Sequence, residues 1–303
     1  MDGLWIPLTV GAAFAQTLRN AAQRGLVATA GTLGATLVRF LFALPFAVVY
    51  TALVFVVAGE RIPDITRGFV LWVLAGGLAQ IAATALLLRV MEERNFAIGV
   101  AYSKTELIQV AVFAAVFLGD PLGGATGIAI VIATAGVLLL SPLGAQGGLR
   151  GLLTGWTSRS ALLGIASGAG FAISATGYRG AALELEGEVS ATVAAAYTLV
   201  WAQGWQVLVL GGYLLWRNAG VLVALFKAWR QSIAAGFAGA AASAGWFTAM
   251  AMEPVAHVRT LGLVELLFSL AIARRAFREH VTRIELAGMA LLTVSLVLVT
   301  LAG

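Results

Sequence analysis

Long apolar runs recur along the whole chain, and they constrain its fold more than any other feature. Most of these runs approach or exceed about 18 residues, enough for a helix to cross about 30 Å of hydrocarbon. Only 11% of the 303 residues are charged, against about 25% in an ordinary soluble domain. The sequence therefore predicts an all-α integral membrane protein with several membrane-spanning helices.

The apolar runs predict ten transmembrane helices, each bounded by polar residues, glycine or proline. A polar, glycine-rich segment, residues 143–158, is the predicted linker between a first part, residues 1–142, and a second part, residues 159–303. Five helices fall in each part. The predicted helices are residues 4–22, 32–57, 68–89, 97–118, 125–140, 160–179, 190–216, 232–252, 257–277 and 284–302.

The two parts resemble each other when the chain is compared with itself at an offset of 159 residues. Glu106 then aligns with Glu265, and Asp120 aligns with Glu279. Acidic residues are rare in this chain, so these matches carry more weight than matches between apolar residues. An odd number of helices per repeat inverts the second repeat in the membrane. Inverted repeats are typical of secondary transporters, whose substrate site lies near the membrane midplane.

Composition excludes several other classes of protein. The chain has no cysteine, which excludes disulfides and thiolate metal sites, and we expect neither a metal nor another cofactor. The net charge of +5 fits basic loops against anionic lipid better than nucleic-acid binding. Sequence motifs of zinc proteases, P-loop proteins and nucleophile-elbow hydrolases are absent, so we expect no enzyme.

Charged side chains inside the predicted helices are the main functional candidates. Arg39 and Lys104 lie roughly 10 Å deep at 1.5 Å per residue; Glu106 lies deeper, and Glu265 reaches a comparable depth from the opposite side. A charge at the bilayer centre costs about 2.5 to 3.5 kcal/mol, so we expect pairing, with Glu106 as a partner of Lys104 or Arg39. Such pairs either fix the helices in place or line a polar cavity.

Polar and aromatic residues complete the predicted substrate site. Tyr102 and Glu106 share one helix face, whereas Lys104 points elsewhere. Trp201 and Trp246 either pack or form a flat wall for an apolar or aromatic solute. The predicted substrate-binding set is Arg39, Gln80, Thr84, Tyr102, Lys104, Glu106, Trp201, Gln203, Ser243, Trp246 and Glu265.

Three stretches resemble the EamA-type family of ten-helix drug/metabolite transporters. They are Arg39-Phe-Leu-Phe-Ala-Leu-Pro, Phe117-Leu-Gly-Asp-Pro-Leu and Phe277-Arg-Glu-His-Val-Thr-Arg-Ile-Glu-Leu-Ala-Gly288. The family usually has an acid at the positions of Asp120 and Glu279, followed by a helix that begins with glycine. Gly288 fits this pattern, whereas Ala129 stands at the matching place in the first repeat. Length and helix number also resemble the YddG-like amino acid exporters.

The resemblance implies a secondary transporter in a bacterial inner membrane. We expect a monomer that exports amino acids, with aromatic and other neutral ones favoured, and similar small metabolites. Its partners would be the solute and membrane lipids. We favour uniport by alternating access; in a proton-coupled transporter Glu106 or Glu265 would carry the proton. A drug or sugar-phosphate carrier of the same fold and a non-transport membrane protein stay open as alternatives.

Loop charges predict the orientation of the chain. With ten helices, thirteen basic residues fall in the loops of one side and four in those of the other. The positive-inside rule then places both termini outside the cytoplasm, a departure from many family members. A reporter that works only outside the cytoplasm, fused after Gly303, should therefore be active. A silent fusion that is well expressed would contradict this orientation.

Overall fold

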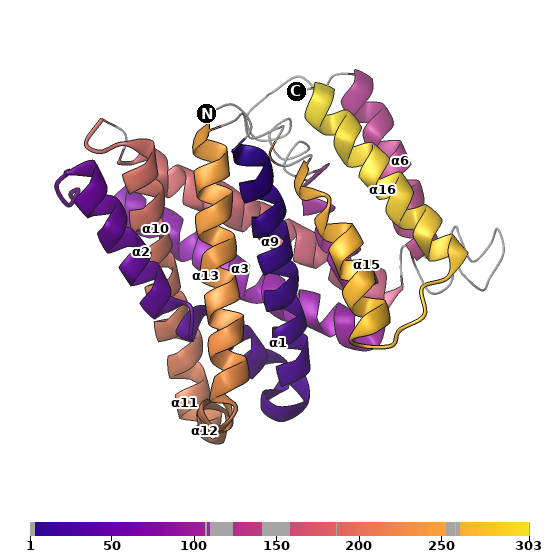
Figure 1. Cartoon of the computed structure of the whole chain (residues 1–303), viewed down its shortest axis with the longest axis horizontal. Helices are drawn as coiled ribbons and strands as arrows, with labels where there is room; N and C mark the ends of the chain where they lie inside the picture. The colour runs from indigo at the N-terminus through magenta and orange to yellow at the C-terminus, as the bar shows by residue number, and fades with distance from the viewer. Residues whose placement is uncertain are drawn as a thin grey trace. The chain divides into compact units, whose positions relative to one another are not determined.

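The computed structural model describes residues 4–106, 108–109, 124–140, 158–185, 187–252, 258 and 261–302. Every regular element in these ranges is a helix (Figure 1). The elements are α1 (Trp5–Leu41), α2 (Leu44–Ala58), α3 (Arg67–Glu93), α4 (Phe96–Ser103), α6 (Gly124–Leu140), α9 (Arg159–Leu183), α10 (Ala191–Gln206), the π-helix η2 (Val207–Gly211), α11 (Gly212–Asn218), α12 (Gly220–Lys227), α13 (Trp229–Met252), α15 (Glu265–Arg275) and α16 (Arg283–Ala302).

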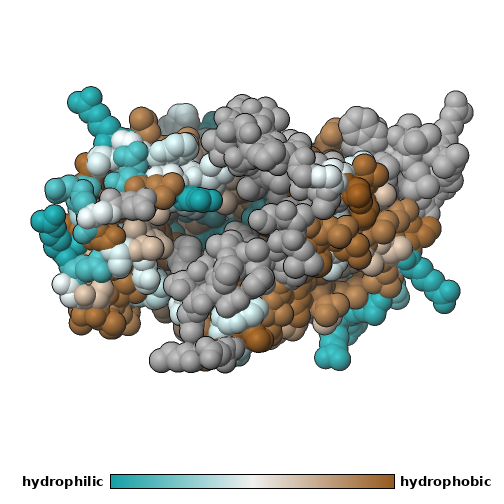
Figure 2. All heavy atoms as spheres, turned by 90° about the horizontal axis from the view of Figure 1, so that it is seen from above, coloured by the Kyte–Doolittle hydropathy of each residue, from teal (hydrophilic) through white to brown (hydrophobic). Residues whose placement is uncertain are grey.

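The helices carry the apolar surface of a membrane protein. Helix α2 exposes Val49, Leu53 and Val56, whose spacing of four and three residues places them on one face. Figure 2 shows apolar side chains, in brown, over large parts of the described surface. Such exposed stripes are unusual in soluble monomers and suit contact with lipid. Among the described residues, the segments long and apolar enough to cross a membrane are four: Trp5–Ala58, Arg67–Glu93, Arg159–Leu183 and Ala191–Asn218.

The connection between the first two predicted helices differs from the prediction. Helix α1 continues through the predicted loop, residues 23–31, to Gly31, where a φ of 68° and a ψ of 172° break the helical path. Positive φ costs glycine little. The predicted helix over residues 32–57 is divided by a turn at residues 42–43, just before Pro45. The chain leaves the helix after Leu41 and resumes in α2, with Pro45 in its first turn, where a missing N–H costs no bond.

Other predicted helices are also interrupted. Helix α4 ends at Ser103, and a turn follows at residues 104–105. The predicted fourth helix runs on to residue 118, but residues 110–123 lie outside those described. The π-helix η2 interrupts the predicted seventh helix. In the predicted ninth helix, residues 258 and 261–262 are helical, and a turn at residues 263–264 precedes α15, which begins at Glu265. Residue 257 lies outside those described.

Contacts divide the chain into two units, which we describe separately. The first unit is Met1–Ala85 with Ile173–Pro254, and the second is Leu86–Ala172 with Val255–Gly303. The boundaries fall within α3 and within α9. Each unit therefore contains residues from both predicted repeats. The repeats themselves are defined by sequence and stay a prediction.

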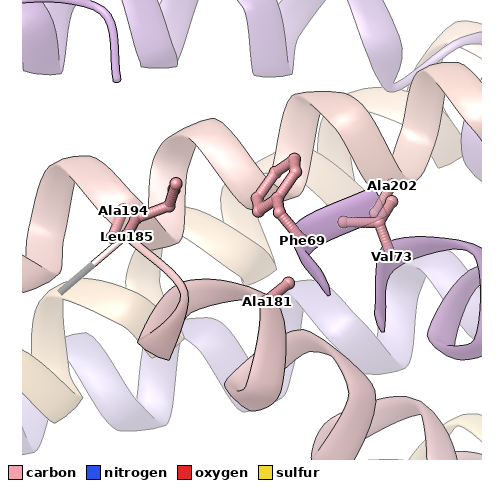
Figure 3. Close-up of a cluster of buried hydrophobic side chains, with 6 residues drawn as sticks. All are labelled: Phe69, Val73, Ala181, Leu185, Ala194 and Ala202. Atoms are coloured by element: carbon pink, nitrogen blue, oxygen red, sulfur yellow. The ribbon is translucent and has the colours of Figure 1, made fainter. Parts of the chain in front are cut away.

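In the first unit, α1 packs along α13 and α2 packs against α10 (Figure 1). Helices α3 and α9 approach most closely at a glycine pair: a Cβ on Gly177 would lie 2.9 Å from the Cα of Gly76. Small residues at a crossing let two backbones come together. An apolar cluster joins α3 to α9 and α10 nearby, as Figure 3 shows, through Phe69, Val73, Ala181, Leu185, Ala194 and Ala202.

In the second unit, α6 lies beside α16 (Figure 1). Helix α4 packs against α15. A Cβ on Gly136 would lie 2.9 Å from the carbonyl oxygen of Gly288, and a Cβ on Gly288 would lie 2.8 Å from that of Gly136. The start of α4 is held by two side chains. Asn95 Oδ1 accepts the N–H of Ile98, and Glu279 Oε2 accepts that of Phe96, both at 2.8 Å. The Glu279 carboxylate thus caps a helix N-terminus, where negative charge is favourable.

The crossing of α6 with α16 should not tolerate a side chain. In Gly136→Val the new Cβ would meet backbone atoms of Gly288 and Leu292, at 2.9 and 3.1 Å. Overpacking of this kind costs about 1 to 3 kcal/mol, so we expect a lower melting temperature in detergent. Gly127→Val is the control, because no described atom lies within 4 Å of a Cβ at this position of the same helix. Equal melting temperatures for the two variants would contradict the close crossing.

Candidate functional site

The predicted substrate-binding residues divide between the two units. Among the described residues, no three His, Asp or Glu side chains come together as metal ligands would. The first unit contains Arg39, Gln80, Thr84, Trp201, Gln203, Ser243 and Trp246, and the second contains Tyr102, Lys104, Glu106 and Glu265.

The second unit buries an ion pair between Lys104 Nζ and Glu265 Oε2. The side chain of Glu265 is 1% exposed and that of Lys104 is 16% exposed. Lys104 stands at the C-terminus of α4, and Glu265 is the first residue of α15. Each charge therefore lies at the helix end whose dipole stabilises it. The helix dipole and the opposite charge of the partner therefore both stabilise the ion pair.

The pairing of Lys104 with Glu265 was not predicted from the sequence. We expected Glu106 to neutralise Lys104 or Arg39; the described ion pair of Lys104 is with Glu265, and a pairing of Glu106 with Arg39 stays a prediction. Lys104 lies in the turn that follows α4, so the helical spacing used for the prediction does not apply to Lys104 and Glu106. Glu106 itself is half-buried.

The helix face that Tyr102 shares with Glu106 packs on α9. Tyr102 is fully buried, and a Cβ on Gly164 would lie 2.6 Å from the Cβ of Tyr102. One turn beyond Glu106, Gln109 donates from Nε2 to the carbonyl oxygen of Ile165 at 3.0 Å. This side of the segment is therefore in contact with protein, and Tyr102 has no exposed surface for a solute in this conformation.

A second ion pair in this unit was missed from the sequence. Arg94 Nη2 lies 2.9 Å from Glu285 Oε1 and 3.4 Å from the carbonyl oxygen of Leu140. The other carboxylate oxygen of Glu285 accepts the N–H and the hydroxyl of Thr282, at 2.8 and 3.0 Å. A threonine followed three residues later by glutamate is a capping-box signal, and it stands in the sequence just before the apolar run of α16. Asp120, the acid that aligns with Glu279, lies outside the described residues.

In the first unit, polar side chains from α1, α3, α9 and α10 meet. Arg39 Nη1 donates to Thr84 Oγ1 at 3.0 Å. Gln80, one turn earlier on the same face of α3, accepts at Oε1 from the hydroxyl of Tyr178 at 3.1 Å and from Nε2 of Gln206 at 2.8 Å. Tyr178 and Gln206 were not among the predicted residues. A neutral polar residue on an apolar helix stands out less in a sequence than a charge does.

Trp201 lies in an aromatic cluster of the first unit. Its ring meets Phe69 edge-on, with the centroids 6.2 Å apart and the planes at 90°, and it also contacts Tyr197 at 6.2 Å. The remaining face of Trp201 is exposed. This arrangement is the one expected of packing, the first of the two alternatives drawn from the sequence.

Ser243 and Trp246 both lie on α13. The hydroxyl of Ser243 donates to the carbonyl oxygen of Gly239 at 3.1 Å, within its own helix. Trp246 donates from Nε1 to Gln16 Oε1 at 3.2 Å, which joins α13 to α1. Each of these donors already has an acceptor in the protein, so a solute would have to compete for it.

No protein-family model matches the chain, and no curated protein matches it. A solved structure described only as "Crystal structure of protein" is similar, with a TM-score of 0.58 at 16% sequence identity. The alignment covers 100% of this chain and 97% of that one. At this identity the match shows a common fold along the full length, and it carries no information on function.

The buried ion pair of the second unit gives a direct prediction. Lys104→Met removes one partner of a buried ion pair, which can cost about 3 to 5 kcal/mol, so the melting temperature in detergent should fall. Adding Glu265→Gln should restore part of the loss. The control is Arg89→Met, which breaks an exposed pair with Glu92 worth about 0 to 1 kcal/mol. A Lys104→Met protein as stable as this control would show that the pair does not hold the unit together.

Proposed function

We propose that this protein is a secondary transporter of the EamA type in a bacterial inner membrane. It exports amino acids, with aromatic and other neutral ones favoured, and similar small metabolites. In this proposal ten transmembrane helices form two inverted five-helix repeats, and the protein works as a uniporter by alternating access.

The observation that supports transport best is the set of buried polar side chains on long apolar helices. Gln206 is fully buried and Gln203 nearly so, and both lie on a helix long and apolar enough to span a membrane. Polar groups at membrane depth are expensive and typically mark solute pathways. Amides beside Arg39 and apolar walls suit a solute with two charged ends and a hydrophobic side chain.

The positions of the helices support two repeats. At the offset of 159, α6 aligns with residues 283–299, which lie within α16. At the same offset α13 aligns with residues 70–93, which lie within α3. Helices at corresponding positions are expected when two segments derive from one ancestral unit.

The ion pair of Glu265 with Lys104 supports uniport over proton coupling. An acid that joins α4 to α15 in this way has a structural role that requires no proton transfer. The solute gradient alone then drives transport.

Flux in proteoliposomes tests this proposal. We expect the purified protein to carry L-phenylalanine down its gradient at the same rate with and without an imposed pH gradient. Protein-free liposomes, a sugar phosphate and a cationic dye serve as controls. Accumulation of phenylalanine above equilibrium, driven by the pH gradient alone, would refute uniport and direct attention to Glu106 and Glu265. Transport of the dye or the sugar phosphate, with no amino acid moved, would refute amino acid export.

A further inference from the structure

The amide of Gln206 is held in one orientation by the polar cluster of the first unit. Its Nε2 donates to Gln80 Oε1 at 2.8 Å and to the Tyr178 oxygen at 3.0 Å, and lies 3.4 Å from the carbonyl oxygen of Gly77. The Tyr178 hydroxyl in turn donates to Gln80. With the nitrogen of Gln206 committed in this way, its Oε1 is turned away from these partners.

Two amide oxygens on this turn of α10 lack a donor. Oε1 of Gln206 and Oε1 of Gln203 are both buried and accept no hydrogen bond from the described residues. Gln203 and Gln206 are three residues apart, so they lie on the same side of the helix. A buried acceptor without a donor is costly, and this cost is recovered when a group with N–H or O–H donors binds there.

The helix changes geometry at the same place. The π-helix η2 begins at Val207, directly after Gln206. π-Helical turns are rare and are frequently found at functional sites. On the facing helix α3, Gly77 leaves room for this turn, since a Cβ there would lie 3.2 Å from Trp205 Cδ1 and 3.6 Å from Gln206 Cγ. The π-helix and the two unpaired amide oxygens are independent observations, and both favour a ligand-binding site at this turn of the helix.

We propose that Gln203 and Gln206 bind the α-ammonium group of the solute. This inference rests on the proposed export of amino acids and adds the residues that recognise the solute's amino group. Neutral amide oxygens accept N–H donors without introducing a charge. The guanidinium group of Arg39, bonded to Thr84 one turn along α3 from Gln80, suits the carboxylate end.

This arrangement selects for solutes with both charged ends. A simple amine would bring its positive charge toward Arg39 with no carboxylate to offset the repulsion. A carboxylic acid without the amine would leave both amide oxygens unpaired. We therefore expect the protein to bind L-phenylalanine more tightly than either phenethylamine or 3-phenylpropanoate.

The test compares Gln203→Met and Gln206→Met with Gln23→Met in the full-length protein. Gln23 is the matched control, because it is buried in the same unit and donates to the carbonyl oxygen of Ala35 at 2.9 Å. Calorimetry in detergent should show at least tenfold weaker phenylalanine binding for the first two variants and unchanged binding for the third. Binding of 3-phenylpropanoate should change little in any variant.

Melting temperature without solute gives a second readout. Gln203→Met removes an unpaired acceptor, so it should be as stable as the wild type or more stable, while Gln23→Met should be less stable. If Gln203→Met and Gln206→Met bind phenylalanine as tightly as the wild type does, the inference is overturned. Amino acid export would still be supported in that case if the wild-type protein transports phenylalanine. An equal loss of 3-phenylpropanoate binding would also overturn it. A wild-type protein that neither binds nor moves any amino acid would overturn both.

Discussion

Hydrocarbon offers no hydrogen bonds, so a polar group that enters it must find its partner within the protein. Several buried groups among the described residues follow this constraint. The ammonium of Lys104 meets the carboxylate of Glu265, the guanidinium of Arg39 meets Thr84, and the amide of Gln206 meets Gln80 and Tyr178. Other buried polar atoms of the described residues have no hydrogen-bond partner, among them Oε1 of Gln203 and Oε1 of Gln206. In a soluble protein, water can satisfy such a group at the surface. In a helix surrounded by lipid, an apolar side chain at the same position would be more stable, so an unpaired polar side chain there indicates a function.

Close packing between helices also stabilises the fold. Lipid tails are as apolar as the helix surfaces, so helices in a membrane associate through van der Waals contact and hydrogen bonds more than through exclusion of water. Glycine pairs serve this purpose in both units, at Gly76 with Gly177 and at Gly136 with Gly288. The hydrogen bond between Tyr178 and Gln80 lies next to the first of these crossings, on the same two helices. Its geometry therefore depends on residues that carry no functional group.

The sequence predicted where the helices lie better than how they meet. The apolar run over residues 125–140 matches α6 almost to the residue, because length and hydropathy are local properties. The partner of Lys104 was not identified, since helical periodicity tells which residues share a face but not which distant helix comes to it. Glu265 is 161 residues away along the chain. The π-turn after Gln206 left no recognisable signal, because a single added residue per turn changes neither composition nor hydropathy.

The crossing of α6 with α16 also bears on how this chain changes over evolutionary time. Its two glycines come from the two predicted repeats, and each one's missing side chain makes room for the backbone of the other. Neither position is then free to vary on its own: a larger residue in one repeat could be accepted only if the opposite helix moved away along its whole length. After a duplication, two copies of a unit normally drift apart independently. Here a single contact would oblige them to diverge together.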